Sequence, residues 1–390
     1  MKKNSIAKQT VKKPRHRKTS KARQAERRSS AGMVKQVVGL DLGDKSSRYC
    51  VLDSEGIVQV ERSVATTRPG FTQAFAKMAR SRIALEVGTH SPWVSRLLES
   101  LGHEVIVANA RRVRIISESS RKDDRMDAQM LARLARVDPA LLYPIRHRGE
   151  QAQQHLAMVK ARAGLVDGRT ALVNTARGLT KPFGERIGKC DADQMRVGKI
   201  EKLAVGVQAM LQPLLVVVEA MTEQIQSYDK ELAEIARKHY PETALLEQIT
   251  GVGLLIALTF ILTLFILTLD DAERFRHSRD VGCFLGLRPK RRESGQSQPQ
   301  LGITKEGDVY LRRLLVQGAH YILSKRGPDT DLKRWGLKLA GSGDKRAKKK
   351  AVVAVARKLA ILLHHLWVSG EVYEPLRHSQ PPAERSAPAA

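Results

Sequence analysis

Residues 37–43, VVGLDLG, decide the fold of the first part of this chain. Apolar residues on either side of a glycine predict a buried strand, and Asp41 stands at its end. The stretch RIALEVG, residues 82–88, has the same character and carries Glu86 in the same position. Two buried strands that each end on an acid predict a sheet with carboxylates along one edge.

Strands and helices alternate outward from these two runs. Residues 48–64 hold two β-rich runs with a turn between them. SPWVSRLLESLG, residues 91–102, predicts a helix with Ser91 as its N-cap and Gly102 as its end. HEVIVAN, residues 103–109, predicts a further strand. This alternation predicts an α/β sheet.

The carboxylates form a set that suits a hard cation. An acid at the end of a buried strand is costly unless it has partners or binds a cation, which applies to Asp41 and Glu86. Asp124 and Asp127 lie three residues apart in a predicted helix and therefore share a face. The four acids together predict a site for one or two Mg²⁺ or Mn²⁺ ions. Asp123 is an alternative to Asp124.

The net charge of the chain is +28 over 390 residues. Such a surplus favours polyanions, and nucleic acid is the expected partner. With only 4% aromatic residues, phosphate contacts rather than base stacking should carry the affinity. A histone-like packing protein fits the charge as well. Residues 1–35 predict a disordered basic tail, either solubilising or bound to phosphates.

The cysteines and the apolar runs bear on the compartment. Three cysteines, far apart and odd in number, form neither a zinc spacing nor a disulfide framework, which favours the reducing cytoplasm, with the chain associated with the nucleoid. Residues 252–269 form an uncharged run of 18 that includes FILTL twice in tandem. Because this run contains a glycine and three threonines and has no counterpart, we expect a buried helix and no membrane span.

The middle of the chain, from about 150 to 240, is helical with a break at 181–184. The second half has apolar positions alternately four and three residues apart, which predicts a coiled-coil seam. The seam residues are Leu214, Val218, Met221, Ile225, Tyr228, Leu232 and Ile235. A weaker seam precedes the break, at Val159, Ala163, Val166, Thr170 and Val173. A dimerisation arm and an intramolecular spacer are equally compatible with this pattern.

A loop dense in cations follows in the last helical part and contains Ser294 before a glycine. Taken alone, the pattern favours a phosphate contact over a nucleophile, because a serine needs a base or metal to be activated. Ser297 is the alternative serine. The cations expected to bind nucleic acid are Arg288, Lys290, Arg291, Arg292, Lys305, Arg312 and Arg313. Residues 345–350 begin a basic helix that suits a solvated face and a nucleic-acid contact equally.

The motifs GLDLG, LEVG and KDDRMDAQMLA together resemble the DEDD-type transposases of the insertion-sequence-110 family. The resemblance continues through ITGVGLLIALTFILTL, FLGLRPKRRESGQS and LGITKEGDVYLRRLLVQGAHYIL, and it covers about 36–325. It implies an RNase H-like, RuvC-related catalytic domain and a C-terminal transposase domain. The expected division is a tail at 1–35, the RuvC-like domain at 36–148, a coiled-coil arm at 149–243, the transposase domain at 244–370 and a disordered tail at 371–390.

The resemblance also implies a mechanism. Asp41, Glu86, Asp124 and Asp127 would hold the metal, and Ser294 would attack a DNA phosphate as nucleophile. An element-encoded RNA would guide the choice of DNA, and a homo-oligomer, a dimer or tetramer, would combine the acids of one protomer with the serine of another. Two departures from the family are an aspartate at 123, where threonine is common, and the extra FILTL, which could re-aim the helix after it and impair this copy.

Three other functions remain open on the sequence. A RuvC-like nuclease or junction resolvase would use metal-activated water and would not need Ser294. An actin-like or sugar-kinase ATPase would use GLDLGDKSS as a phosphate loop, although a second matching half is missing and the charge stays unexplained. A packing protein would have no use for Asp41.

Overall fold

The computed structural model describes residues 36–109, 124–147, 149–265, 277–292, 294, 297, 299, 301–341 and 343–379. The chain divides into two compact units, 1–145 and 146–390, and each is described by itself. The predicted tail at 1–35, the part 380–390 of the predicted tail at 371–390, the alternative acid Asp123 and most of the second FILTL copy lie outside the described residues.

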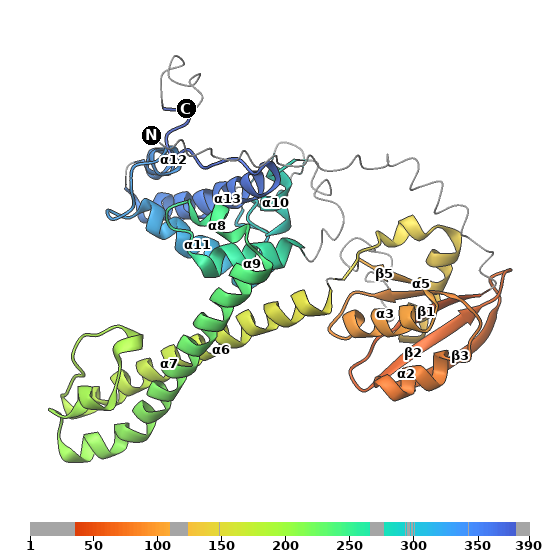
Figure 1. Ribbon diagram of the computed structural model, residues 1–390, viewed down its shortest axis with the longest axis horizontal. Coiled ribbons are helices and arrows are strands. Elements are labelled where there is room, and N and C mark those ends of the chain that lie inside the picture. The colour runs from red at the N-terminus through yellow and green to blue at the C-terminus, as the bar shows by residue number, and fades with distance from the viewer. Residues whose placement is uncertain are drawn as a thin grey trace, which may run out of the picture. The chain divides into compact units, whose positions relative to one another are not determined.

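The first unit contains a five-stranded mixed sheet in the order β3-β2-β1-β4-β5 (Figure 1). The strands are β1 (Val37–Asp41), β2 (Ser46–Leu52), β3 (Val58–Ala65), β4 (Arg82–Glu86) and β5 (Glu104–Ala108). β1 pairs antiparallel with β2 and parallel with β4, and β5 is parallel to β4. Three parallel strands extended by an antiparallel hairpin confirm the predicted α/β class.

Helices cover both faces of this sheet. Helices α2 (Arg68–Phe75) and α3 (Ser91–Ser100) bury Phe71 and Leu98 against the side chains of Val38 and Leu40. Side chains alternate along a strand, so the residues between those two face the other way. Helix α5 (Asp124–Val137) covers that second face. The central strands are therefore buried on both sides, as their nearly continuous apolar runs predict.

The start of α3 differs from the sequence prediction. The cap is His90, whose side chain makes no capping hydrogen bond, and Ser91 is already inside the helix. The Ser91 hydroxyl instead donates to the Gly88 carbonyl and accepts from the Gly88 N–H, so it closes the loop after β4. Gly102 ends the helix as predicted, with a positive φ of 93°.

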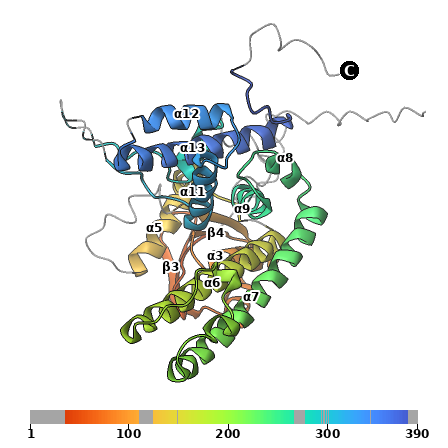
Figure 2. The same cartoon turned by 90° about the vertical axis from the view of Figure 1, so that its left-hand side faces the viewer.

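The second unit begins with a long helical hairpin, α6 (Glu150–Leu179) and α7 (Val205–His239), seen side by side in Figure 2. Short 3-10 helices between them, η2 (Lys181–Phe183), η3 (Ala192–Gln194) and η4 (Val197–Ile200), form a small tip with its own apolar cluster around Met195. The break at 181–184 is confirmed, and Gly184 turns the chain with a φ of 71°.

The seam of α7 is shifted from the predicted one. Three predicted positions, Val218, Ile225 and Leu232, are buried. The other four lie half-buried, and the buried line continues instead through Leu211, Leu215, Thr222 and Ala236. The shift has a physical cause in polar layers across the hairpin, where Arg162 pairs with Asp229 at 2.5 Å and Arg169 donates to the Thr222 hydroxyl.

The remaining helices pack around the base of this hairpin. They are α8 (Thr243–Glu247), α9 (Leu254–Phe265), α10 (Arg279–Phe284), α11 (Val309–Leu323), α12 (Asp331–Ala340) and α13 (Lys345–Ser369). One apolar cluster joins Leu156 and Leu232 of the hairpin to Phe260, Leu315 and Leu359. The hairpin and the C-terminal helices therefore share a core.

The uncharged run at 252–269 forms helix α9 in its described part, and residues 256–264 are buried, as expected for a core helix. Two other helices, α7 and α13, are long and apolar enough to cross a membrane by length and composition alone. Each has a packing partner in this unit: α7 lies against α6, and α13 lies in the shared core. Both helices that satisfy the length and composition criterion therefore pack against other helices of this unit.

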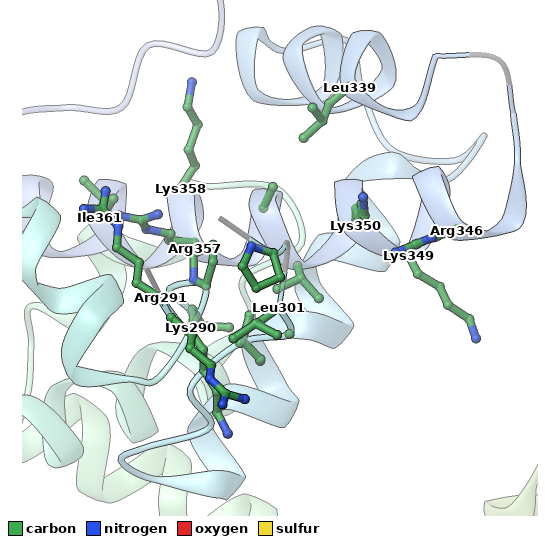
Figure 3. A pocket seen from close by; sticks show the side chains of 18 of the residues that line it. Lys290, Arg291, Leu301, Leu339, Arg346, Lys349, Lys350, Arg357, Lys358 and Ile361 are labelled. Atoms are coloured by element: carbon green, nitrogen blue, oxygen red, sulfur yellow. The ribbon is translucent and has the colours of Figure 1, made fainter. Parts of the chain in front are cut away.

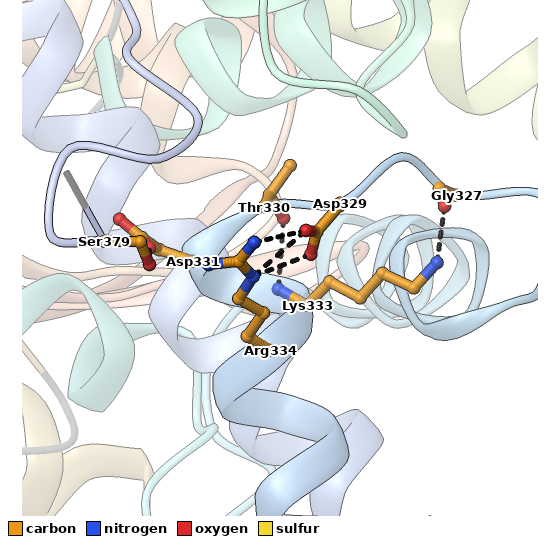
Figure 4. Close-up of polar contacts among 7 residues, drawn as sticks. All are labelled: Gly327, Asp329, Thr330, Asp331, Lys333, Arg334 and Ser379. Carbon is orange, nitrogen blue, oxygen red and sulfur yellow. Dashed lines mark hydrogen bonds and ion pairs between the residues drawn. The ribbon is translucent and has the colours of Figure 1, made fainter.

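The segment 371–379 is a correction to the predicted disordered tail. Asp331, at the start of α12, accepts from the His378 N–H at 2.7 Å and from the Ser379 hydroxyl, and its own N–H donates to the Pro375 carbonyl. Thr330 caps the same helix by accepting from the Lys333 N–H (Figure 4). Amino-acid composition could not predict the ordering of this segment, because its hydrogen bonds are made to a helix start that is distant in sequence. These hydrogen bonds fix α12 in place.

We predict that Gly39→Ala destabilises the first unit by roughly 3 kcal/mol, because the added methyl cannot avoid the backbone of α5. A Cβ at Gly39 would lie 1.8 Å from the Ala128 carbonyl oxygen. Calorimetric unfolding of the full chain would measure the loss. Gly88→Ala is the matched control, since a Cβ there meets nothing within 4 Å. Equal melting temperatures for both variants would contradict the close packing of α5 on β1.

Candidate active site

Asp41 and Glu86 lie side by side at one edge of the sheet. β1 and β4 are parallel neighbours, with Leu40 opposite Leu85, and the two acids are the next residues on each strand. Adjacent strands are spaced about 4.8 Å apart, so the two carboxylates start from neighbouring positions. Both residues are half-buried. The sequence prediction that they occupy equivalent strand ends is confirmed.

Strand alternation decides which face they point to. Asp41 shares a face with Gly39, and Glu86 shares one with Ala84. Gly39 lies under Ala128 and Ala132 of α5, and Ala84 packs in the cluster that contains Leu131. Both acids therefore project to the face that α5 covers.

The direction of α5 brings its first turn to the same edge. Along β1, Val37 packs with Leu131 and Ala135, whereas Gly39 lies against Ala128 and Ala132. The contacts thus move toward the start of α5 as the strand advances, and the next residue on that face is Asp41. Helix α5 begins at Asp124, with Asp127 one turn along. The elements that carry all four acids meet at this edge.

The side chains that the structure describes do not by themselves form a complete set of metal ligands. Within the described residues, no three acidic, histidine or cysteine side chains lie close enough together to hold an ion. Asp127 is half-buried, and the side chain of Asp124 lies outside the described part. Carboxylate oxygens from two strand ends and one helix start are the donors that Mg²⁺ prefers, so the donor set fits a divalent cation. The four-acid set stays a prediction.

Ser294 lies in the second unit, at the far end of a hairpin-like loop. The base of the loop is paired by the Lys290 N–H on the Gly302 carbonyl at 2.9 Å and by the Thr304 N–H on the Arg288 carbonyl at 3.0 Å. Ser294 and Ser297 then pair with each other through both backbone N–H groups, at 3.2 and 3.0 Å. Both serines are exposed.

The seven predicted nucleic-acid cations divide into two groups. Five are exposed on the loop: Arg288, Lys290, Arg291, Arg292 and Lys305. The other two make hydrogen bonds within the protein. Arg312 donates through one nitrogen to the carbonyls of Leu285 and Glu306, at 3.0 and 2.7 Å. Arg313 donates to both oxygens of Asp167 on α6, and lies 5.0 Å over the Tyr310 ring.

A second group of cations lies near this loop. The sequence left residues 345–350 open between a solvated face and a nucleic-acid contact, and Arg357 and Lys358 were missed. Arg346, Lys349, Lys350, Arg357 and Lys358 of α13 line the same cavity as the loop residues 290–292. The signal was available in the sequence, since these positions recur three, four or seven residues apart and so share one side of a helix.

These features define a class of protein. A mixed sheet with acids at the ends of neighbouring parallel strands and at the start of the covering helix is the arrangement of RNase H-like enzymes that cut nucleic acid with a divalent metal. Two family models match the chain, a DEDD transposase model at residues 38–182 and a model described as the transposase IS116/IS110/IS902 family at 243–333. The chain belongs to the IS110/IS116/IS902 family of transposases, enzymes that cleave and transfer DNA.

Three similar proteins are also described as transposases. The transposase for insertion sequence element IS1111A of Coxiella burnetii is 28% identical over 355 residues, covering 89% of this chain and 93% of that protein. A probable family 20 transposase of Pseudomonas aeruginosa is 27% identical, covering 87% and 98%. The transposase for IS1328 of Yersinia enterocolitica is 26% identical, covering 86% and 98%. The resemblance seen in the motifs therefore extends over nearly the whole chain.

We predict that Arg312→Ala lowers the free energy of unfolding of the second unit by about 2 kcal/mol, because two backbone carbonyls lose a charged donor. It should leave the salt dependence of DNA binding unchanged. Arg292→Gln, on the exposed loop, should leave the free energy of unfolding unchanged. It should reduce the slope of log K against log salt by about 0.9, the value for one phosphate contact. Thermal unfolding and binding titrations in a salt series measure both. A reduced slope with full stability for Arg312→Ala would place that residue on DNA.

Proposed function

We propose that this transposase cuts and rejoins DNA through Ser294, beside a divalent-metal site formed by Asp41, Glu86, Asp124 and Asp127, and that an element-encoded RNA guides it. The observation that carries the proposal is the position of Ser294. It is an exposed serine held at the end of a paired loop whose exposed neighbours are cations. It also stands where the family resemblance expects the nucleophile.

The chemistry of the serine step balances as a transesterification. The Ser294 Oγ forms a bond to a DNA phosphorus, and one P–O bond to a sugar breaks. The serine proton passes to a base, and the departing sugar oxygen takes up a proton as a hydroxyl. The phosphoserine ester keeps the energy of the broken bond, so a second sugar hydroxyl can attack it and rejoin the strand without a further energy source.

The loop around the serine supports binding and orientation of the phosphate. Arginine can hold two phosphate oxygens at once, and Arg291 and Arg292 precede the serine by three and two residues. The backbone pairing of Ser294 with Ser297 limits the positions that the hydroxyl can take. Ser297 is equally exposed and equally paired, which makes it the internal control for the nucleophile.

The acids would hold the metal on the sheet edge. A bound Mg²⁺ or Mn²⁺ supplies positive charge to phosphate oxygens in the transition state. The half-buried position of Asp41 and Glu86 strengthens their attraction for a cation relative to open water. The first turn of α5 also favours negative charge, because its backbone N–H groups point toward its start.

Assembly and guidance rest on other features. From the family resemblance we infer a homo-oligomer, a dimer or tetramer, in which one protomer's acids serve another's serine. The placement of the acids and the serine in different units is compatible with such a shared site. The α6–α7 hairpin offers a rigid element for such an assembly. A net charge of +28 suits simultaneous binding of RNA and DNA.

We predict that Ser294→Ala abolishes a covalent protein–DNA adduct and lowers strand cleavage on the order of 10³-fold or more, as loss of a nucleophile does elsewhere. Ser297→Ala should retain the adduct. Denaturing gels of the full chain with end-labelled DNA would show the adduct. If Ser294→Ala cleaves as well as the parent, the reaction uses water, and the chain acts as a RuvC-like nuclease.

We predict that Asp41→Asn and Glu86→Gln each abolish cleavage while DNA affinity, measured in EDTA, changes less than twofold. The amides keep size and hydrogen bonding but lose the charge that a divalent ion needs. Asp44→Asn, an exposed acid three residues after Asp41, is the matched control and should leave cleavage intact. Cleavage by Asp41→Asn at the parent rate and at the parent's metal concentration would argue against Asp41 as a ligand, whereas rescue by excess metal would support it.

A guide RNA would be recovered with the protein. We predict that the chain, purified after expression with its flanking DNA, retains a structured RNA encoded beside its gene. Removing that RNA with ribonuclease should stop recombination and leave unguided DNA binding in place. Recombination at full rate after ribonuclease treatment would exclude RNA guidance while leaving the serine step untouched.

A further inference from the structure

The second unit contains a large open cavity beside the serine loop (Figure 3). It has a volume of about 1120 Å³ and is lined by residues 287, 289–292, 299 and 301–303 of the loop, by α12 and by α13. Trp335 and Leu339 come from α12, which the bonds of Thr330 and Asp331 hold in place.

The charge of this cavity has one sign. Eight of its 19 lining residues are Lys or Arg, and none is Asp or Glu. Five of the eight lie on α13, between Arg346 and Lys358, and the other three lie on the loop. The distance along the helix is about 18 Å at 1.5 Å per residue, which exceeds what a single small anion needs. The cavity therefore suits a ligand with several phosphates in a row.

The interior of the cavity is apolar. Ten lining residues are hydrophobic or proline, and they include Trp335, Leu301 and Leu339. Leu301 and Leu339 are 37% and 46% exposed, so the floor is open to solvent. Apolar surface inside a cationic rim matches a ligand that presents an uncharged flat group together with its phosphates.

Two side chains link the rim to the floor. The Lys358 ammonium lies 3.9 Å from the centre of the Trp335 ring, which places a cation at the edge of the apolar surface. The buried Arg357 Nε has no hydrogen-bond partner among the described residues. A buried donor without a partner is costly.

We propose that this cavity binds an unpaired nucleotide of a nucleic-acid strand, with its phosphates on the α13 cations and its base against Leu339 and Trp335. The proposal rests on the proposed function only in that the adjacent loop acts on nucleic acid. A duplex keeps the flat faces of its bases stacked inside and offers a protein phosphates and base edges only. A single strand offers base and phosphate together, which the cavity requires. The strand is either RNA or DNA, and the two share this chemistry.

The test compares charge-matched variants in the full chain. Arg346→Gln with Lys349→Gln removes two cations from the cavity, and Lys345→Gln with Lys348→Gln removes two exposed cations of the same helix turns that do not line it. Anisotropy titrations in EDTA use a labelled 12-nucleotide single strand, as DNA and as RNA, and a blunt duplex. The first pair should weaken single-strand binding about tenfold and lower the salt slope by about 1.4. The second pair should change neither by more than a small fraction.

The apolar contact has its own matched pair. Leu339→Ala removes floor surface, and Leu337→Ala removes the same side chain from the same helix at 49% exposure, outside the cavity. With one 2-aminopurine in the strand, the fluorescence change on binding should be lost for Leu339→Ala and kept for Leu337→Ala. Duplex binding should not distinguish them. A stronger effect on the RNA or the DNA strand identifies the natural source.

Three results would overturn the proposal: equal losses for both charge pairs, an unchanged 2-aminopurine signal for Leu339→Ala, or competition by polyglutamate as strong as by the oligonucleotide. The outcome is separable from that of the serine mechanism. An intact protein–DNA adduct with unchanged single-strand binding removes only the cavity proposal, and lost cleavage by Ser294→Ala with the expected binding differences is compatible with both.

Discussion

The close packing of α5 on β1 is the constraint on which the candidate site depends. Gly39 allows the helix backbone to approach until no side-chain atom fits between them. That approach fixes α5 over the ends of β1 and β4, so the acids of two strands and one helix start share an edge. A larger residue would lift the helix and separate the acids, even though none of the acids had changed. The glycine in VVGLD therefore matters to the chemistry as much as the aspartate two residues later.

A second constraint couples the hairpin arm to the serine loop through α11. Arg312 and Arg313 are adjacent on this helix but point to different partners. Arg312 holds the carbonyls of Leu285 and Glu306 at the base of the loop, and Arg313 holds Asp167 of α6. Tyr310 lies beside Arg313 and Arg162, and its burial raises the pKa of its hydroxyl. One turn of helix thus ties the position of the loop to the arm.

The sequence predicted the elements that are buried on both sides and missed the details that depend on partners. The runs at 37–43 and 82–88 became β1 and β4 because only a two-sided core accepts so many apolar residues in succession. The α7 seam was displaced because Asp229 and Thr222 take polar partners on α6, which a search for apolar positions cannot register. Ser91 was misplaced because its hydroxyl bonds backward to Gly88. From the sequence alone, the cations at the start of α13 fitted a solvated face and a nucleic-acid contact equally well, because the loop that shares their cavity was not known.

The division of the chain into two units gives the net charge a mechanical meaning under the proposed mechanism. The acids fold with residues before 146 and the serine folds with residues after it, so neither core requires the other. A surplus of +28 opposes bringing such units, or two protomers, close together. Bound nucleic acid removes that repulsion because its phosphates neutralise the cations. The substrate would then be a structural part of the assembled site, and the acids and the serine would come together only on bound nucleic acid.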